Sequence, residues 1–192
     1  MLLFYTSLAS AALSHSSDME WFTQESEHFR IHYYQDGEVS VQRVLAIAEM
    51  VHKELSDYLN WQPLERTEIV LSDEMDPSNG FATPLPYNTM TLYLTAPDEI
   101  NSLEDHNGWL ELLIRHEYLH VLHLDKRSRG PAMLQKLFGR MPLLFPNMFQ
   151  PTWFIEGLAT YVETDHERQI GRGQSSFYEM MMRMEALSGM KP

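Results

Sequence analysis

The stretch RHEYLHVLH, residues 115–123, decides how this chain folds and what kind of site it can hold. His116 and His120 are four residues apart, so on a helix their rings project from the same face. Two imidazole nitrogens at this spacing can both reach one zinc ion. Glu117 lies about 100° further round the helix, beside such an ion, where it can accept a proton from water. The pattern indicates a catalytic zinc helix, although two histidines can also share a helix by coincidence.

The surroundings of this stretch favour a metal. The apolar residues between about Glu104 and Leu124 run nearly all round the predicted helix, which should therefore be buried. Polar side chains are costly to bury unless they are paired or bind a metal. A metal-free alternative has to find partners for all the polar residues of this helix, which are Arg115, His116, Glu117, His120 and His123.

Glu156 is the best candidate for the third protein ligand that a catalytic zinc site needs. It lies in WFIEGLATYVE, residues 153–163, which predicts another helix. We expect apolar neighbours to bury Glu156 against the first helix, and these are Trp153, Phe154, Leu158, Ala159 and Val162. An isolated glutamate there would be an unpaired buried charge. In the alternative, Glu156 is exposed and Glu163 or an acid in a loop is the ligand.

The composition is that of one globular domain. The chain has 192 residues, of which 44% are hydrophobic and 21% charged. Its net charge of −13 and the absence of a run of Lys or Arg argue against a nucleic-acid partner. The chain has no cysteine, so disulfides and thiolate zinc sites are excluded and a metal must be held by His and carboxylate groups.

The N-terminal residues 1–13, MLLFYTSLASAAL, predict a truncated signal peptide. They are apolar and small, and Ala9-Ser10-Ala11 fits the pattern that precedes signal cleavage. No Lys or Arg occurs before Arg30, so the usual positive start is missing. The segment is too short to span a bilayer, which takes about 20 apolar residues, and no other transmembrane candidate is present. We expect export to the periplasm or the cell exterior; if this segment is not a signal, the protein is cytoplasmic.

The remaining spacing predicts an α+β fold, because strands come first and helices follow. We expect strands at 28–34, 68–73 and 89–95, and helices at 38–60, 104–124, 132–139, 153–163 and 174–188. Pro84 and Pro86 precede the third strand, which places it at the edge of a small mixed sheet of three or more strands. This sheet should pack on the buried histidine helix. We assign the methionines of 174–188 to core packing rather than to a binding surface.

HEYLH followed by WFIEGLATYVE resembles the gluzincin branch of the zinc metallopeptidases, in which an H-E-x-x-H helix precedes a helix with W-x-x-E-G-x-A. The resemblance implies a zincin-like fold and one zinc ion per chain. It also implies that His116, His120 and Glu156 are the ligands, that Glu117 is the general base and that the substrate is a peptide or protein.

The combined pattern is also similar to the peptidase-MA-like domains of larger bacterial exported proteins, which often precede a β-propeller. The resemblance covers roughly residues 20–190. We therefore expect a zincin-like domain over residues 18–192, incomplete at its C-terminus, with further domains such as a β-propeller after it.

Several positions depart from the better-known gluzincins. Thirty-five residues separate His120 from Glu156, so we interpret 125–151 as an insertion that roofs the cleft. Gluzincin aminopeptidases hold the substrate's amino terminus with a glutamate in a G-x-M-E-N segment, but no acid lies between Gly80 and Asp98. This difference favours an endopeptidase, and it leaves the strand at 89–95 free to pair with an extended peptide.

The metzincin pattern does not fit, because His123 and Lys126 occupy the positions where metzincins have glycine and a third histidine.

Three further residues are candidates for supporting roles. A Tyr or His usually helps to stabilise the oxyanion in such enzymes, and Tyr161 and Tyr178 are candidates by position. His123 lies on the same side of the helix as His120 and could support a ligand. Core packing is the alternative for all three. The leading hypothesis is zinc-dependent peptide hydrolysis; the alternative is a catalytically silent, zinc-stabilised binding module of a larger exported protein.

Overall fold

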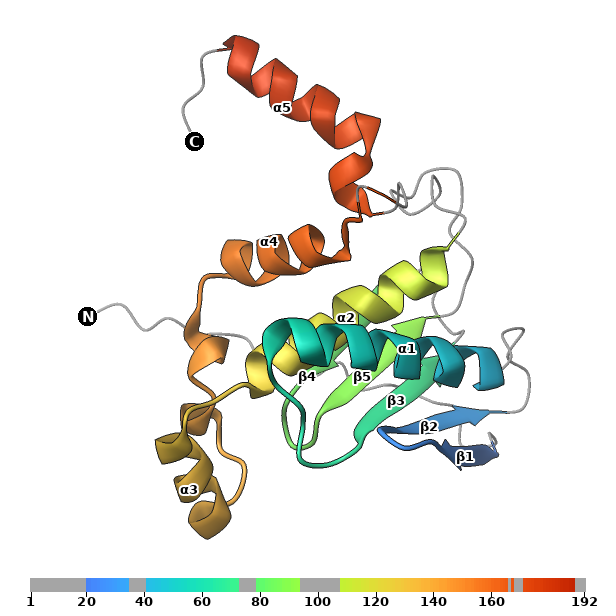
Figure 1. Ribbon diagram of the computed structural model, residues 1–192, viewed down its shortest axis with the longest axis vertical. Helices are drawn as coiled ribbons and strands as arrows, with labels where there is room; N and C mark the ends of the chain where they lie inside the picture. The colour runs from blue at the N-terminus through green and yellow to red at the C-terminus, as the bar shows by residue number, and fades with distance from the viewer. Residues whose placement is uncertain are drawn as a thin grey trace.

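The computed structural model describes residues 20–34, 41–72, 79–93, 108–165, 167 and 171–188. It joins a five-stranded mixed sheet to a set of helices (Figure 1), so the predicted α+β class is confirmed. The predicted signal segment, 1–13, lies outside the described residues. Among the helices of the described ranges, none has the length and apolar character needed to cross a membrane.

The sheet has the strand order β1-β2-β3-β5-β4. Its strands are β1 (Trp21–Glu25), β2 (Phe29–Tyr34), β3 (Thr67–Ser72), β4 (Asn79–Thr83) and β5 (Thr89–Tyr93). The three central strands, β2, β3 and β5, run parallel, and the two outer strands pair antiparallel to their neighbours. Alternating side chains of β2, with Phe29 and Ile31 inward, build the apolar face that the sequence pattern predicted.

The predicted edge position of the strand at 89–95 is wrong. Strand β5 lies between β3 and β4, and the edge is β4, a strand that was not predicted. Pro84 and Pro86 belong to the tight connection between β4 and β5, so they mark a turn rather than an edge. Strand β4 is short and contains Gly80, which weakens its sequence signal.

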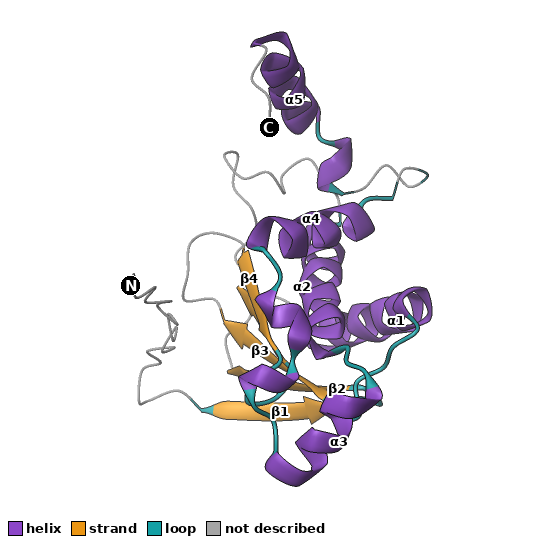
Figure 2. Ribbon diagram, turned by 90° about the vertical axis from the view of Figure 1, so that its left-hand side faces the viewer, coloured by secondary structure: helices purple, strands orange, loops and turns teal. Residues whose placement is uncertain are grey.

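Two long helices cover the inner face of the sheet (Figure 2). Helix α1 (Val41–Leu59) packs on β2, and α2 (Trp109–Asp125) packs on β4 and β5 and against α1. The apolar residues of α1 recur at helical spacing, and those of its middle turns are buried, namely Val44, Leu45, Ala48, Val51 and Leu55. Helix α2 is buried over nearly its whole length, which also agrees with the sequence. The HEYLH residues are therefore held between a sheet and a second helix.

After α2 the described chain continues as helices and turns, one of which packs back on α2. Helix α3 (Arg129–Phe138) and the 3-10 turns η1 (Pro142–Leu144) and η2 (Pro146–Phe149) lead to α4 (Thr152–Glu163), which packs on α2. After α4 come the short turn η3 (Arg172–Gln174) and α5 (Ser176–Ser188).

A buried ionic cluster fixes the position of the segment that follows α2. Asp125 is fully buried, and its carboxylate accepts a hydrogen bond from Trp61 and pairs with Arg127 and Arg140. Arg140 also donates to the Pro84 carbonyl and to Asn88, both in the connection between β4 and β5. The segment is therefore tied beneath the C-terminal end of α2.

The prediction that the methionines of 174–188 pack in the core is wrong. Met180, Met181, Met182 and Met184 are all exposed. Helix α5 extends away from the sheet (Figure 1), and among the described elements its main contact is with η3. Helical spacing of apolar residues cannot show whether another element is present to cover them.

Candidate metal centre

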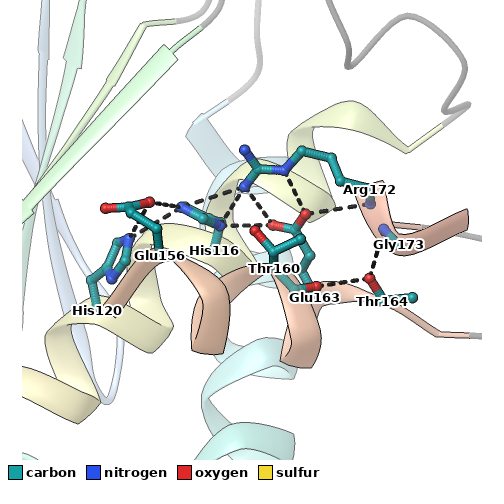
Figure 3. Close-up of polar contacts among 8 residues, drawn as sticks. All are labelled: His116, His120, Glu156, Thr160, Glu163, Thr164, Arg172 and Gly173. Atoms are coloured by element: carbon teal, nitrogen blue, oxygen red, sulfur yellow. Dashed lines mark hydrogen bonds and ion pairs between the residues drawn. The ribbon is translucent and has the colours of Figure 1, made fainter. Parts of the chain in front are cut away.

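His116, His120 and Glu156 form one cluster, with the histidines on α2 and the glutamate on α4 (Figure 3). One ligand atom from each residue lies within 4.8 Å of the other two. The two histidine Nε2 atoms are 3.1 Å apart. Glu156 Oε2 lies 3.4 Å from Nε2 of His116 and 3.6 Å from Nε2 of His120.

The surroundings of Glu156 differ from those predicted. Trp153 and Phe154 are exposed, and the side chain of Glu156 is itself 53% exposed. Helix α4 instead turns Ala159 and Glu163 toward α2, where both are buried. Glu156 is therefore held at the rim of the site, and its charge is not buried among apolar residues as expected.

Glu163 is fully buried and lies on the other side of the His116 ring. Its Oε2 atom is 2.7 Å from His116 Nδ1, so this ring nitrogen can donate to the carboxylate. This donation leaves a lone pair on Nε2, which is the atom that faces His120 and Glu156. In this geometry Glu163 orients a histidine, and its carboxylate is not part of the cluster that could hold a metal ion.

Arg172 supports Glu163 from η3 (Figure 3). Its Nε donates to Oε1 at 2.6 Å and its Nη2 to Oε2 at 2.8 Å. Burial would raise the pKa of Glu163, but hydrogen bonds from Arg172 and His116 together outweigh burial and hold this pKa below its ordinary value. Arg172 Nη2 also lies 2.6 Å from His116 Nδ1. A guanidinium only donates, so when Nδ1 carries its proton Arg172 does not bond to this nitrogen and pairs with the carboxylate of Glu163.

The polar atoms at the cluster fit a bound cation. The two Nε2 atoms face each other, and the buried Nδ1 of His120 has no hydrogen-bond partner among the described residues. Burial, and then the neighbouring His116, lower the pKa of His120 to about 4, so its ring is neutral and carries a lone pair at neutral pH. Two imidazoles and one carboxylate are a donor set that suits a divalent transition metal.

Glu117 lies on α2 beside the cluster, with its carboxylate against the backbone of Gly80 in β4. Burial raises the pKa of Glu117 to about 7, and the charge of Glu156 acts in the same direction, while His116 opposes it. A carboxyl group that titrates near neutral pH can both accept and release a proton under physiological conditions.

A pocket of about 350 Å³ opens in front of these groups. Strand β4 forms one wall, α2 forms the floor with His116, Glu117 and His120, and α4 contributes Ile155 and Glu156. Arg172 completes the lining. No residue of 125–151 lines the pocket, so the expectation that this insertion roofs the cleft is wrong. The ties of Asp125 hold it at the far end of α2 instead.

Of the three predicted supporting residues, the two whose side chains the structure describes, His123 and Tyr161, do not line this pocket. His123 is buried toward the C-terminal end of α2, and burial lowers its pKa, but it does not line the pocket. Tyr161 is exposed and lines another hollow with Tyr58 and Arg115. Tyr178 lies on α5, and its side chain is outside the described part of the chain.

Two residues at the site were missed by sequence reasoning, and one was given another role. Nothing in the sequence signalled Arg172 or the contact of Gly80 with Glu117. Glu163 was considered only as an alternative ligand. A signal for it existed, because Glu163 follows Glu156 by seven residues, which is about two helical turns and places both on one face of the helix.

No family model and no curated protein matches this chain. Among solved structures, the chain is similar to the crystal structure of an aminopeptidase N family protein from Idiomarina loihiensis, with a TM-score of 0.43 and 13% sequence identity. The similarity covers 76% of this chain and 24% of that protein. The chain thus spans about a quarter of the length of the structure that it matches.

Proposed function

We propose that this protein is a zinc-dependent peptidase in which His116, His120 and Glu156 hold the ion and Glu117 is the general base. The observation that carries the proposal is the convergence of these three ligand atoms from two helices beside a buried carboxyl group. Tetrahedral zinc with bonds of about 2.0–2.1 Å sets its ligand atoms about 3.4 Å apart. The separations of 3.1, 3.4 and 3.6 Å are consistent with that arrangement.

Zinc, when bound, supplies Lewis-acid activation of a water molecule and of the scissile carbonyl group. Glu117 accepts the proton that the attacking water loses, and then delivers it to the amide nitrogen that leaves. In the metal-free protein burial raises the pKa of this carboxyl group to about 7, which makes it a stronger base than an exposed glutamate. Glu163 and Arg172 keep the His116 ring in the orientation that points Nε2 into the site.

The substrate that fits this site is an extended peptide. Strand β4 pairs with β5 on one side only among the described residues, and its residues 79–82 line the pocket. A peptide can add to this strand by main-chain hydrogen bonds, with its scissile bond over the cluster. Strand β4 therefore takes the role that the sequence had suggested for residues 89–95.

Endopeptidase action is part of the proposal. The acids that line the described pocket are Glu117, Glu156 and Glu163, and each already has another role. Among the described residues of the pocket, no other acid is available to hold the amino terminus of a substrate. Export through residues 1–13, the domain bounds 18–192 and a following β-propeller stay predictions.

The experiment is to measure zinc content and hydrolysis of an unbiased peptide mixture, before and after chelation and zinc restoration. We expect one zinc per chain and cleavage that depends on zinc. Glu117→Gln should bind zinc as the wild type does and lose hydrolysis by several orders of magnitude. Unchanged cleavage by this variant would show that Glu117 is not the base.

A second candidate function is a zinc-stabilised binding module without turnover. It is favoured by one observation: apart from His116 and His120, the described residues that line the pocket include no Tyr or His to stabilise an oxyanion. Full zinc occupancy together with peptide binding but no cleavage would support this module over the peptidase.

A further inference from the structure

We propose that Gly80 is a positioning residue for Glu117, because its missing side chain makes the space that the carboxylate occupies. The inference rests on the proposed role of Glu117 as the base. A Cβ atom at Gly80 would lie 2.6 Å from Cγ of Glu117 and 2.7 Å from both Cδ and Oε1. All three distances are shorter than a real Cβ atom shows in a folded protein. A side chain at position 80 and the present position of the Glu117 carboxylate therefore exclude each other.

The backbone conformation of Gly80 does not explain the glycine. The glycines with positive φ in the described chain are Gly139 and Gly171, so Gly80 has a conformation open to any residue. Glycine also weakens a strand compared with most residues. The space taken by Glu117 is the structural reason for a glycine at this position.

Strand β4 and helix α2 fix the two backbones on either side of this contact. Gly80 pairs with Leu92 of β5, and α2 packs across β4. Side chains alternate along a strand, so positions 80 and 82 face α2 while Phe81, which is 55% exposed, faces away. Of the atoms in contact, those free to move are the outer atoms of the Glu117 side chain. A methyl group at 80 should therefore displace the carboxylate and leave the fold intact.

The first test is Gly80→Ala, with Gly130→Ala as the control because a Cβ atom at 130 meets nothing within 4 Å. We expect Gly80→Ala to keep its zinc content and KM and to lose roughly tenfold to hundredfold in kcat, as misplaced catalytic groups do. The control should have the kcat of the wild type. A wild-type kcat in Gly80→Ala would overturn the proposal.

The second test does not depend on activity. In the metal-free protein, Gly80→Ala should lower the midpoint of thermal unfolding, whereas in a Glu117→Ala background it should not, because the crowded atoms are gone. An equal loss in both backgrounds, or failure of both variants to fold, would place the conflict on the strand backbone and overturn the inference. If the wild type proves inactive, the proposed function fails, and this comparison still decides the role of Gly80.

A second, independent observation concerns the segment 126–154, and we infer that it docks on an anionic lipid surface. This segment contains five Lys or Arg residues, out of 14 in the chain, and none of the 27 acids. All 27 acids lie outside this segment, together with the other nine Lys or Arg, so the segment has a net positive charge in an otherwise acidic protein and is attracted to an anionic surface.

The same segment exposes large apolar side chains. Six of them are 60–75% exposed, namely Met133, Leu137, Phe138, Leu143, Phe149 and Trp153. Helix α3 buries none of its residues, and it lies away from the body of the sheet and α2 (Figures 1 and 2). Apolar surface of this extent usually marks a contact with a partner or a membrane.

The mixture of residues favours lipid over an acidic protein. Arg129 and Lys136 are exposed on α3 beside Leu137 and Phe138, and Trp153 and Phe149 follow. Cations interleaved with Trp, Phe and Leu are typical of helices that lie in the interface of a bilayer. Arg127 and Arg140 are occupied by Asp125, and they hold the segment in place.

The test is sedimentation of the full chain with phosphatidylcholine vesicles, with and without phosphatidylglycerol, at low and high salt. We expect salt-sensitive binding to the anionic vesicles only, reduced at least tenfold by Leu137→Ser with Phe138→Ser. Leu64→Ser, at a position 80% exposed elsewhere on the surface, should bind as the wild type does. Absence of binding, or equal binding to both kinds of vesicle, would overturn the inference. Self-association that the double substitution removes would overturn it in favour of a protein interface.

Discussion

Glu163 Oε2 lies 2.7 Å from His116 Nδ1, while Glu156 Oε2 lies 3.4 Å from Nε2 of the same ring. Each nitrogen of this imidazole thus lies close to a different glutamate of α4. The buried acid orients the ring, and the half-exposed acid lies with the ring in the cluster that could hold a cation. The two roles follow from burial, because Glu163 is sealed against α2 with Arg172 and Glu156 opens to the pocket.

Glu163→Gln should lower zinc affinity by about tenfold to hundredfold, because an amide holds the His116 tautomer more weakly than a carboxylate. Competition with a chromophoric chelator measures this affinity. Glu185→Gln, on the exposed surface of α5, is the matched control and should bind zinc as the wild type does. Equal affinity in the Glu163 variant would mean that the ring is held by other contacts.

Arg172→Met should also weaken zinc binding, because Glu163 then loses its bidentate partner and is more easily protonated. The pair acts as a unit, so the losses of Arg172→Met and Glu163→Gln should not add in the double variant. Additive losses would show that Arg172 influences the metal independently of Glu163. The measurement is the same chelator competition, applied to all four proteins of the cycle.

Stability of the metal-free protein should depend on pH through Glu117. Burial raises its pKa from an ordinary 4.5 to about 7, so the folded chain binds more protons than the unfolded chain between these values. Stability is therefore lost as pH rises through this window. Glu117→Gln does not titrate, so its free energy of unfolding should exceed that of the wild type by an amount that grows between pH 4.5 and 7, to at most about 3 kcal/mol. Urea unfolding in chelator at several pH values checks this. An advantage that does not change with pH would contradict a raised pKa.

Asp125→Ala should destabilise the fold by about 3–5 kcal/mol, because it leaves Arg127 and Arg140 without their shared buried acid. Denaturant unfolding measures the loss, and Asp57→Ala on α1 is an exposed control. A loss below about 1 kcal/mol would mean that water or other acids replace the carboxylate.

The parts of this structure that sequence reasoning could predict are those with a local signal. His116, His120 and Glu117 follow from spacing on one helix, and the α1 stripe follows from its period. Strand β4 could not be predicted in this way, since it is short, contains a glycine and ends at a proline. The exposure of the α5 methionines depends on which elements lie opposite them, and that information is not in their own spacing.

The partners of the site residues show the same limit. Glu156 was found through its motif, but its exposure depends on how α4 rotates against α2. Arg172 reaches the site after a turn at Gly171, whose φ of +99° brings the backbone close to Thr164 and Glu163. No property of residues near Arg172 in the sequence indicates this approach.

The separation of 35 residues between His120 and Glu156 has a consequence for a chain without cysteine. An ion held by both residues joins two distant points of the backbone, as a disulfide would. By the chain-entropy argument, a cross-link that closes a loop of this length lowers the conformational entropy of the unfolded state, which destabilises that state by about 4 kcal/mol. The ligands of the proposed reaction would then also stabilise the packing of α4 on α2, and this added stability would be lost when the metal leaves.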